Sequence, residues 1–520
     1  IGSPRGTNED HYVGQKFARE FMNSANLDVS SNTHPEITKA LEEMIGTRNS
    51  TSRIWQLLDT ECVLVVSSNI TESQNVVSVP IKQAAANGTK IIVIDQRETE
   101  LTRYADIWLR PKVDSEVDLI GGIMRAIIDE SLEDNDVCQS LENFTEFRNS
   151  LWDYDLTDIE MTTGISQDAI REAARMFANA DNASTIYSLE TVSPDLRQDC
   201  TESVVNLSLM TGNIGNGPSG IYPMFKGANE QGARDVGACV EYFPNHADAD
   251  DSAIGVTNLA ESLVSGKIRA LQVVGDSPTF DDPQLGDFYK GFEKAELLIV
   301  HDTFESKLTD IADVVLPSST FAEKAGTYTN LEGRVHCINP AIGPTNESDE
   351  EWRIFSQIAK RMGADGFEFT SSSDVFAEIQ QSVSLYSDLD LDQVNKSGQL
   401  LKRISHESQF RVISRTDVST DATNSEYPIT FAPGRVLHQP DRDAGIDTVS
   451  DKNSITRSEI VEMNKSDATG YGIAEGDSIR LVGQGFSLSG IAHLNGTVSY
   501  THLRAHETSL HLVCRLLLEK

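Results

Sequence analysis

Two stretches of this chain alternate short apolar strands with helices, and this alternation constrains the fold more than any other feature. The predicted strands are residues 62–67, 90–95, 107–109, 185–188, 270–274, 297–301 and 314–316. The predicted helices between and after them are residues 81–86, 116–132, 168–179, 257–266 and 350–362. Near-continuous apolar strands separated by helices predict an α/β fold with parallel sheets that are covered on both faces.

Polar turns follow four of these strands directly. They begin at Ser68, Gln96, Gly275 and Asp302. Ligands of open α/β sheets bind beyond the carboxyl ends of the strands, so these four turns predict two nucleotide pockets. A GxGxxG motif does not follow the first strand, which argues against a plain NAD-binding domain.

Length and charge limit the possible functions. A chain of 520 residues is too long for one hydrophobic core, and three domains are expected. Its 80 acidic and 43 basic residues give a net charge of −37, which disfavours nucleic acid and anionic membranes as partners. No apolar run approaches the ~20 residues that span a bilayer, so a direct membrane span is not expected.

The six cysteines contain no CxxC spacing. The sequence therefore shows no thiolate framework for zinc or an iron–sulfur cluster. Their low density weakly favours a reducing compartment.

The stretch Ala312–Arg334, ADVVLPSSTFAEKAGTYTNLEGR, combines a strand with a polar, glycine-containing loop. Its glycines permit close approach of the backbone to a ligand, and its Asn and Thr side chains supply short donors and acceptors. These residues alone fit two interpretations equally well, a cradle for a large polar cofactor or a well-bonded turn. Set beside the other polar turns, the loop is predicted to be a cradle.

The last third of the chain changes character. Residues 364–425 are rich in Ser and Asp with weak periodicity, and we interpret them as a linker region. Short β segments after Tyr427 predict a barrel-like domain. Residues 498–520 resemble a translated sequencing adapter, so we interpret them as a non-native tail. The rival interpretation is an amphipathic C-terminal helix.

A series of motifs resembles the molybdopterin oxidoreductases, and most closely the large (α) subunits of formate dehydrogenases. Besides Ala312–Arg334, the motifs are SSNITES (67–73), VIDQRETE (93–100), GNIGNGPSGIYPM (212–224), KGANEQGARDVGA (226–238), GDSP (275–278), HDTF (301–304), PGRVLHQ (433–439) and NKSDATGYGIAEGD (464–477). They occur in the family's order from Ile1 to about Thr497.

The resemblance implies two doubly wound Rossmann-like domains, one inserted in the other, plus a C-terminal β-barrel-like domain. The expected boundaries are 1–29 with 228–400 for the discontinuous domain, 30–227 for the inserted domain, 401–425 for a linker, 426–497 for a truncated β domain and 498–520 for the tail. The family's N-terminal iron–sulfur domain is expected to be missing, because the chain starts abruptly at Ile1.

The resemblance also implies the cofactor, a pair of molybdopterin guanine dinucleotides that chelate molybdenum or tungsten. An iron–sulfur cluster would belong to the missing N-terminal domain. The residues expected to bind the dinucleotides are Ser68, Asn69, Thr71, Glu72, Asp95, Arg97, Gly212, Asn213, Gly215, Gly227, Asn229, Gly232, Gly275, Asp276, Ser277, Asp302, Thr303, Asp313, Gly326, Thr327, Asn330, Arg334, Gly434, Arg435 and His438.

The catalytic positions depart from the family pattern. Formate dehydrogenases place Cys or selenocysteine on the metal, followed by His. Here His34 matches the histidine, but Thr33 stands at the chalcogen position, so the protein ligand to the metal is unknown. Lys226 replaces the active-site arginine of the family. A lysine is a point charge and cannot bind a carboxylate bidentately as an arginine does. We expect His34 to accept a proton and Lys226 to hold an anion.

Two functions remain open. The first is a formate dehydrogenase-like subunit that oxidises a small anionic substrate by two electrons and passes them to iron–sulfur clusters. Its expected partners are electron-transfer subunits with iron–sulfur or flavin groups. The second is a metal-free scaffold, similar to the large iron–sulfur subunit of respiratory NADH dehydrogenases. A cytoplasmic location is favoured, and periplasmic export stays open because the N-terminus is expected to be missing.

Overall fold

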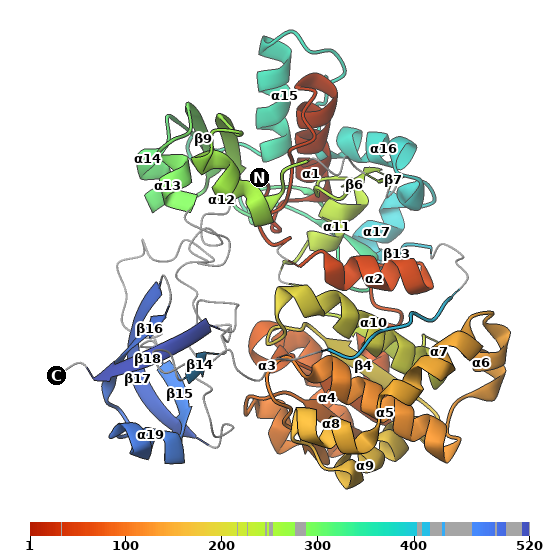
Figure 1. The fold of residues 1–520 in the computed structure, drawn as a ribbon. Helices are drawn as coiled ribbons and strands as arrows, with labels where there is room; N and C mark the ends of the chain where they lie inside the picture. The colour runs from red at the N-terminus through yellow and green to blue at the C-terminus, as the bar shows by residue number, and fades with distance from the viewer. Residues whose placement is uncertain are drawn as a thin grey trace. The chain divides into compact units, whose positions relative to one another are not determined.

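The computed structural model divides into two compact units. The first contains Ile1–Pro35 and Phe225–Arg403, and the second contains Glu36–Met224. Figure 1 labels their helices and strands. The structure describes residues 1–32, 34–215, 217–225, 227–244, 247–248, 253–275, 288–402, 408–416, 429–431, 460–483, 486–495 and 512–518.

The second unit contains a fully parallel sheet of five strands with the order β3-β2-β1-β4-β5. Its strands are β1 (Cys62–Val66), β2 (Lys90–Ile94), β3 (Ile107–Leu109), β4 (Ala183–Tyr187) and β5 (Gly220–Pro223). Cys62 is in register with Lys90 on one side and Ala183 on the other. Every residue of β1 and β4 is buried, as expected for a parallel sheet covered on both faces.

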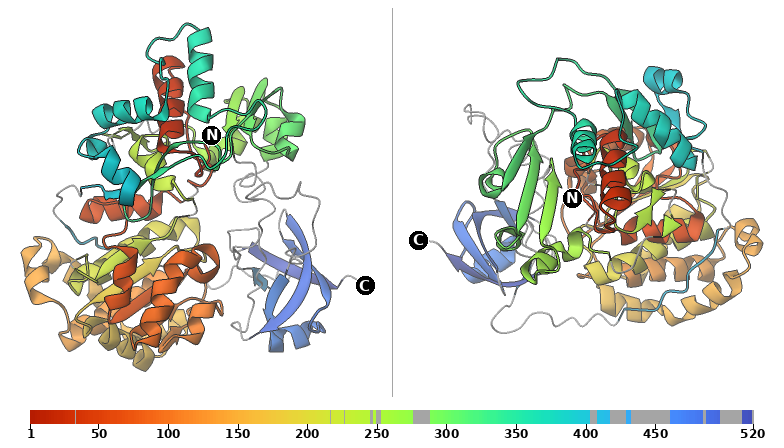
Figure 2. Two further views of the ribbon diagram at one scale, coloured as in Figure 1. Left: turned by 180° about the vertical axis from the view of Figure 1, so that it is seen from behind. Right: turned by 90° about the horizontal axis from the view of Figure 1, so that it is seen from above.

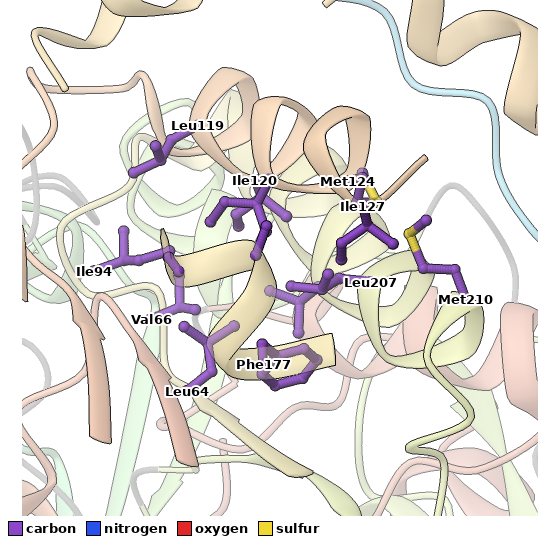
Figure 3. Packing of buried hydrophobic residues seen from close by; sticks show 14 of the residues in the cluster. Leu64, Val66, Ile94, Leu119, Ile120, Met124, Ile127, Phe177, Leu207 and Met210 are labelled. Atoms are coloured by element: carbon purple, nitrogen blue, oxygen red, sulfur yellow. The ribbon is translucent and has the colours of Figure 1, made fainter. Parts of the chain in front are cut away.

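Helices surround this sheet, as Figure 2 shows from behind and from above. They are α2 (Glu36–Ile45), α3 (Ile70–Ser73), α4 (Asn75–Ala86), α5 (Glu116–Glu130), α6 (Asn135–Ser140), α7 (Phe144–Ser150), α8 (Leu156–Thr163), α9 (Gln167–Ala178) and α10 (Pro194–Met210), with short 3₁₀ turns at Ile54–Asp59, Glu100–Arg103 and Leu151–Asp153. In α9, Ile170, Ala173, Ala174 and Phe177 repeat at helical spacing and are buried. Phe177 meets Leu64 of β1 and Leu207 of α10 in the core (Figure 3).

The first unit contains a parallel sheet and an antiparallel sheet of three strands each, plus a short hairpin. The parallel sheet has the order β10-β9-β8, and the antiparallel sheet has the order β11-β12-β13. The strands are β6 (Tyr242–Phe243), β7 (Ala247–Asp248), β8 (Ala270–Val274), β9 (Leu297–Asp302), β10 (Val314–Pro317), β11 (Gly326–Thr329), β12 (Arg334–Ile338) and β13 (Gln399–Leu400).

Helix α1 (Asn8–Lys16) lies at the centre of the first unit, and all nine of its residues are buried. A capping box between Thr7 and Asp10 starts it. It lies beside α15 (Figures 1 and 2). The other helices of the unit are the π-helix Phe17–Phe21, α11 (Glu230–Asp235), α12 (Val256–Val264), α13 (Phe288–Phe292), α14 (Lys307–Ile311), α15 (Glu351–Arg361), α16 (Ser372–Ser382), the 3₁₀ turn Ser384–Tyr386 and α17 (Leu391–Ser397).

The predicted elements of both α/β stretches are confirmed. Their boundaries agree within two residues, and residues 81–86, which were predicted to lie in a helix, are the second half of α4 (Asn75–Ala86). The chain is therefore a mixed α/β protein with parallel sheets. Among the described residues, no helix is long and apolar enough to cross a membrane.

The interpretation of 364–425 as a linker is wrong over residues 364–400. Ser371 caps α16 through Asp374, and Val375, Phe376 and Ile379 bury one face of that helix. Three apolar residues among serines and acids gave too weak a pattern to recognise. Residues 408–416 also pack, because Phe410 is buried and stacks on Phe147 with ring centroids 4.4 Å apart.

The C-terminal part forms a separate five-stranded sheet with the order β14-β18-β16-β17-β15. Its elements are β14 (Ile429–Phe431), β15 (Ile460–Asn464), α19 (Lys465–Tyr471), β16 (Ser478–Gly483), β17 (Phe486–Asn495) and β18 (Leu512–Leu518). The predicted β segments are confirmed, whereas closure into a barrel stays a prediction. Strand β18 lies in the segment interpreted as a non-native tail and pairs with β14 and β16. The origin of that tail stays a prediction too.

Candidate functional site

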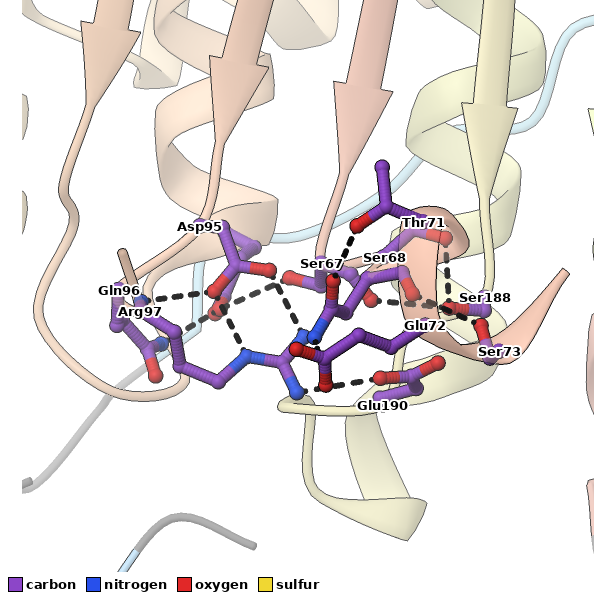
Figure 4. Close-up of polar contacts among 12 residues, drawn as sticks. Ser67, Ser68, Thr71, Glu72, Ser73, Asp95, Gln96, Arg97, Ser188 and Glu190 are labelled. Carbon is purple, nitrogen blue, oxygen red and sulfur yellow. Dashed lines mark hydrogen bonds and ion pairs between the residues drawn. The ribbon is translucent and has the colours of Figure 1, made fainter. Parts of the chain in front are cut away.

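The turns after β1 and β4 meet at the carboxyl edge of the five-stranded sheet (Figure 4). The Ser188 hydroxyl donates to Ser68 Oγ at 2.9 Å and to the Ser67 carbonyl at 3.2 Å. Ser67 has a left-handed backbone with φ of 43°, which turns the chain sharply at the end of β1. Both turns are therefore fixed relative to the sheet.

A buried ion pair lies in the turn after β2. Arg97 Nε donates to Asp95 Oδ1 at 3.0 Å, and Nη2 donates to Asp95 Oδ2 at 2.9 Å. Nη1 reaches Glu190, after β4, at 3.1 Å. Both oxygens of Asp95 therefore accept from the same guanidinium. Arg97 also connects the turn after β2 to the turn after β4.

Glu116, at the start of α5, is fully buried beneath the same turns. Its Oε1 accepts from Gln96 Nε2 at 2.7 Å and from the Ser67 hydroxyl at 3.4 Å. Burial, followed by the charge of Asp114, raises the pKa of Glu116 well above its usual value. Within the described chain, Glu116 Oε2 and Gln96 Oε1 have no hydrogen-bond partner. Two buried polar atoms on neighbouring side chains, without partners among the described residues, are the arrangement expected at a binding site for a polar ligand.

Asn69 organises the short helix α3 at this edge. Its amide donates to Glu72 Oε2 at 3.0 Å, and its Oδ1 accepts from the Thr71 hydroxyl at 3.1 Å. The six predicted binding residues of the turns after β1 and β2 therefore lie together at one edge of the sheet. They are Ser68, Asn69, Thr71, Glu72, Asp95 and Arg97.

The predicted binding residues Gly212, Asn213 and Gly215 do not join that group. Asn213 Oδ1 accepts from the Ala183 amide at 2.8 Å, at the amino end of β4. This is the opposite edge of the sheet. The turn instead leads into β5, which carries the chain back to the carboxyl edge at Met224.

The parallel sheet of the first unit has a similar polar edge. Gly275 has φ of 69° and donates to the His301 carbonyl at 2.6 Å, and Asp302 Oδ1 accepts from the Thr303 amide at 2.7 Å. After β10, Ser318 and Ser319 are buried, and their hydroxyls have no partner within the described chain. Sequence reasoning missed both serines, although they follow a strand exactly as the predicted turns do.

Asp313 lies at the other edge of that sheet, where its Oδ2 accepts from the Leu298 amide at 2.8 Å. The structure therefore does not bring it together with Asp302. The predicted residues Thr33, Lys226, Asp276, Ser277, Gly434, Arg435 and His438 lie outside the described residues.

The loop within Ala312–Arg334 forms the β11–β12 hairpin, and its polar groups bond within the protein. Asn330 Oδ1 accepts from the amides of Glu332 and Arg334, both at 3.0 Å. Thr327 donates its amide and hydroxyl to Glu9 at 2.8 and 2.9 Å. Arg334 Nε lies 3.2 Å from Glu332. These contacts favour the interpretation as a well-bonded turn.

The glycines at 227, 232 and 326 lie against the first residues of the chain. A Cβ atom on Gly232 would lie 1.9 Å from Asn8 Oδ1, and one on Gly227 would lie 2.1 Å from Pro4 Cβ. One on Gly326 would lie 2.6 Å from Glu9 Oε2. Their lack of a side chain therefore has a packing role in this structure.

Asn229 is also buried within the first unit. It donates to the Gly6 carbonyl at 2.8 Å and accepts from the Thr329 amide at 2.7 Å. Like the three glycines, it holds the first residues of the chain in place.

The segment before His34 lies against the segment that follows α11. Asn32 Nδ2 donates to Asp28 Oδ1 at 2.9 Å and to Glu241 Oε2 at 2.8 Å. Burial, followed by the charge of Glu241, raises the pKa of Asp28 to about 7. Cys239 is fully buried in the same place. None of Asp28, Asn32 and Glu241 stood out in the sequence, because their proximity depends on the fold.

Comparisons with known proteins agree with this architecture. The family model "Molybdopterin oxidoreductase" matches residues 2–361. The F420-dependent formate dehydrogenase 2 subunit alpha of Methanococcus maripaludis is 28% identical, over 92% of this chain and 76% of the relative. Formate dehydrogenase H of Escherichia coli is 32% identical, over 70% of this chain and 54% of the relative.

The solved structure of acetylene hydratase from Pelobacter acetylenicus shares the fold. Its TM-score is 0.73 at 18% identity, and the match covers 95% of this chain and 77% of that one. The family model covers well over half of the sequence and includes the polar strand ends of both units. The chain therefore belongs to the molybdopterin oxidoreductase family and is an oxidoreductase that resembles formate dehydrogenase.

Proposed function

We propose that this chain is the catalytic α subunit of a formate dehydrogenase-like enzyme. It oxidises a small anionic substrate by two electrons at molybdenum or tungsten held by two molybdopterin guanine dinucleotides. Family membership implies the molybdopterin and its metal. The observation that carries the proposal further is a set of buried polar atoms at the carboxyl edges of both parallel sheets that have no partner among the described residues.

These atoms fit a nucleotide at each sheet. Gln96 Oε1 and Glu116 Oε2 lie at the first edge, and the hydroxyls of Ser318 and Ser319 lie at the second. A buried polar group without a hydrogen bond costs about 1–3 kcal/mol, and a bound nucleotide would supply the missing partners. The residues that would hold it include Ser68, Asn69 and Arg97 in one unit and Gly275 and Asp302 in the other.

The reacting groups follow from the family resemblance. When bound, the metal accepts the two electrons that leave the substrate. His34 takes the proton, since an imidazole titrates near neutral pH. Lys226 holds the substrate anion as a point charge, which orients it less strictly than an arginine fork. Thr33 provides no sulfur ligand, so the protein contact to the metal differs from that of the family.

The proposed partners are electron-transfer subunits with iron–sulfur or flavin groups. Several relatives are named as alpha subunits, among them the NADPH-Fe(3+) oxidoreductase subunit alpha of Geobacter sulfurreducens, which is 27% identical. A subunit name implies an assembly, and an electron acceptor must receive what the substrate loses. A cytoplasmic location stays a prediction.

The second candidate function is a metal-free scaffold, and two observations favour it. Thr33 stands where the metal ligand is expected. In addition, Asp95 and Arg97 satisfy each other, as they would in a unit that binds no nucleotide.

Metal and nucleotide analysis of the purified full chain separates the two functions. In cells that supply molybdenum, tungsten and pterin, the enzyme is expected to carry equimolar metal and to release guanine nucleotide on acid denaturation. Glu116→Ala should lower the nucleotide content, whereas Glu261→Ala, on the exposed face of α12, should not. A folded chain without metal or pterin contradicts the enzyme and supports the scaffold.

A further inference from the structure

Asp28, Cys239 and Glu241 bring three metal-ligating side chains together in the first unit. One ligand atom from each lies within 4.8 Å of the others. Asp28 and Cys239 are buried, and Glu241 is half-buried. We propose that these residues, with Asn32, form a binding site for a divalent cation of the zinc type, separate from the molybdopterin-bound metal.

Asp28 is held in a fixed orientation by backbone donors. Its Oδ1 accepts from the Val29 amide at 2.8 Å, and its Oδ2 accepts from the Val256 amide at 2.8 Å. Oδ1 also accepts from Asn32 Nδ2, whereas the second lone pair of Oδ2 stays available to a cation. Hydrogen bonds that orient a ligand in this way are typical of metal sites.

Asn32 would supply the fourth ligand, because its side-chain amide lies against both carboxylates. Its side chain is buried, and its Nδ2 lies 2.9 Å from Asp28 Oδ1 and 2.8–3.0 Å from the two oxygens of Glu241. Its Oδ1 has no partner within the described chain. Rotating the side-chain amide by half a turn exchanges the positions of Oδ1 and Nδ2 and directs Oδ1 at the carboxylates. A bound cation would favour that orientation, whereas the orientation in the structure, with Nδ2 donating to both carboxylates, suits the site without a cation.

The donor set selects the kind of cation. A thiolate disfavours magnesium and calcium, which prefer oxygen ligands alone. One sulfur and three oxygens match the four-coordinate preference of zinc, which accepts Cys, Asp and Glu ligands. Two carboxylates and one thiolate leave one negative charge on the zinc complex.

The buried Arg234 guanidinium is a nearby cation along the chain, and it pairs with Glu230 on the same helix. Burial lowers the pKa of Arg234, but Glu230, Cys239 and Glu241 raise it above its usual value. The charges of Cys239 and Glu241 therefore act on a guanidinium that is already paired with Glu230. A cation there would also fix the segment before His34 against the segment after α11.

The test uses cobalt(II) as a probe of the chelator-treated full chain. Cobalt bound to a thiolate gives a sulfur-to-metal charge-transfer band, which should saturate with cobalt and vanish when zinc is added. Cys239→Ser should abolish the band. Cys337→Ser, which removes a half-buried thiol on β12, is the matched control and should keep it. A band that persists in Cys239→Ser overturns the proposal.

Glu241→Gln preserves the size of a half-buried side chain and should weaken zinc binding by about 10–100-fold. Glu261→Gln, on the exposed face of α12, should leave zinc binding unchanged. Equal affinities of the two variants overturn the proposal.

X-ray absorption at the zinc edge needs no variant. The zinc-loaded chain should show one sulfur neighbour at about 2.3 Å and oxygen neighbours at about 2.0–2.2 Å. A shell without sulfur would mean that zinc binds acidic groups elsewhere, and it would refute the site. Molybdenum, tungsten and pterin are measured in the same samples. A chain that binds zinc but no pterin refutes the proposed function alone, and the converse result refutes the zinc site alone.

Discussion

Arg97 Nη1 lies 3.1 Å from Glu190 Oε2, so that one side chain connects the turns after β2 and β4. Strand β1 lies between these two strands in the sheet. Because the same guanidinium also holds both oxygens of Asp95, the contact ties the strands on either side of β1 at their carboxyl ends. The buried guanidinium of Arg97 therefore joins the turns on both sides of β1 at this edge of the sheet.

Removing that cation should be costly. Arg97→Ala leaves the carboxylate of Asp95 buried without its cation and with only the backbone amide of residue 97 as a donor among the described residues, and we expect the free energy of unfolding to fall by about 3–5 kcal/mol in urea denaturation. The matched control is Arg175→Ala, because Arg175 is 56% exposed and pairs with Glu130 at the surface. That variant should lose no more than about 1 kcal/mol. Equal losses in the two variants would contradict the role assigned to the buried pair.

Because of Glu9, the free energy of unfolding should fall as the pH rises. Burial raises the pKa of this carboxyl from 4.5 to about 8, although Thr327 donates two hydrogen bonds to it. Above its unfolded pKa, the carboxyl ionises in the unfolded chain, whereas the folded chain keeps the proton until about pH 8. Unfolding then releases a proton, so the free energy of unfolding falls by up to about 1.4 kcal/mol per pH unit.

Glu9→Gln removes that titration. Urea denaturation at a series of pH values between the two pKa values should show a shallower decline for Glu9→Gln than for the unmodified chain. Glu261→Gln, at an exposed acid, should keep the full decline. Parallel curves for the Glu9 variant and the unmodified chain would show that Glu9 ionises normally in the fold.

Phe410 should stabilise the second unit, although it lies in a stretch interpreted as a linker. Its ring stacks on Phe147 at an interplanar angle of 8°, and its side chain is buried. We expect Phe410→Ala to lower the free energy of unfolding by about 3–5 kcal/mol. Phe321→Ala is the control, since Phe321 is 78% exposed and should change stability by less than about 0.5 kcal/mol. No loss in Phe410→Ala would show that the segment does not pack in solution.

Gly232 should tolerate no side chain. An added Cβ would overlap Asn8 Oδ1 at 1.9 Å and Asn229 Oδ1 at 2.3 Å, and both amides are held by hydrogen bonds. Gly232→Ala should therefore destabilise the first unit by about 1–3 kcal/mol, measured by urea denaturation. Gly343→Ala has open space around the new methyl group and should be neutral. A stable Gly232→Ala variant would mean that α1 can move away from α11.

The apolar runs were sufficient to predict the fold class. Strands such as β1 and β2 are buried on both faces, so their sequences are almost purely apolar and easy to recognise. Helix α16 was missed because only one narrow face of it is buried. Its capping serine and acid resemble the surrounding Ser- and Asp-rich sequence.

The sites were less predictable, because turns come together only through strand order. Ser68 and Arg97 follow strands and could be found, whereas their partners Ser188 and Glu190 depend on β4 lying next to β1. Asn213 has the right chemistry for a ligand, but it lies in the turn before β5, at the amino end of β4 and so at the opposite edge. Whether a turn precedes or follows a strand decides at which edge of the sheet its residues lie. A short turn motif does not contain that information.

The strand order β3-β2-β1-β4-β5 also has a consequence for how the nucleotide edge can change. The connections from β1 and from β4 leave toward opposite sides of the point where the order reverses. A ligand held there touches segments more than a hundred residues apart in the chain. Changes in ligand size or charge must then be matched in both segments at once. We expect Ser68 and Ser188 to covary among homologues rather than to drift separately.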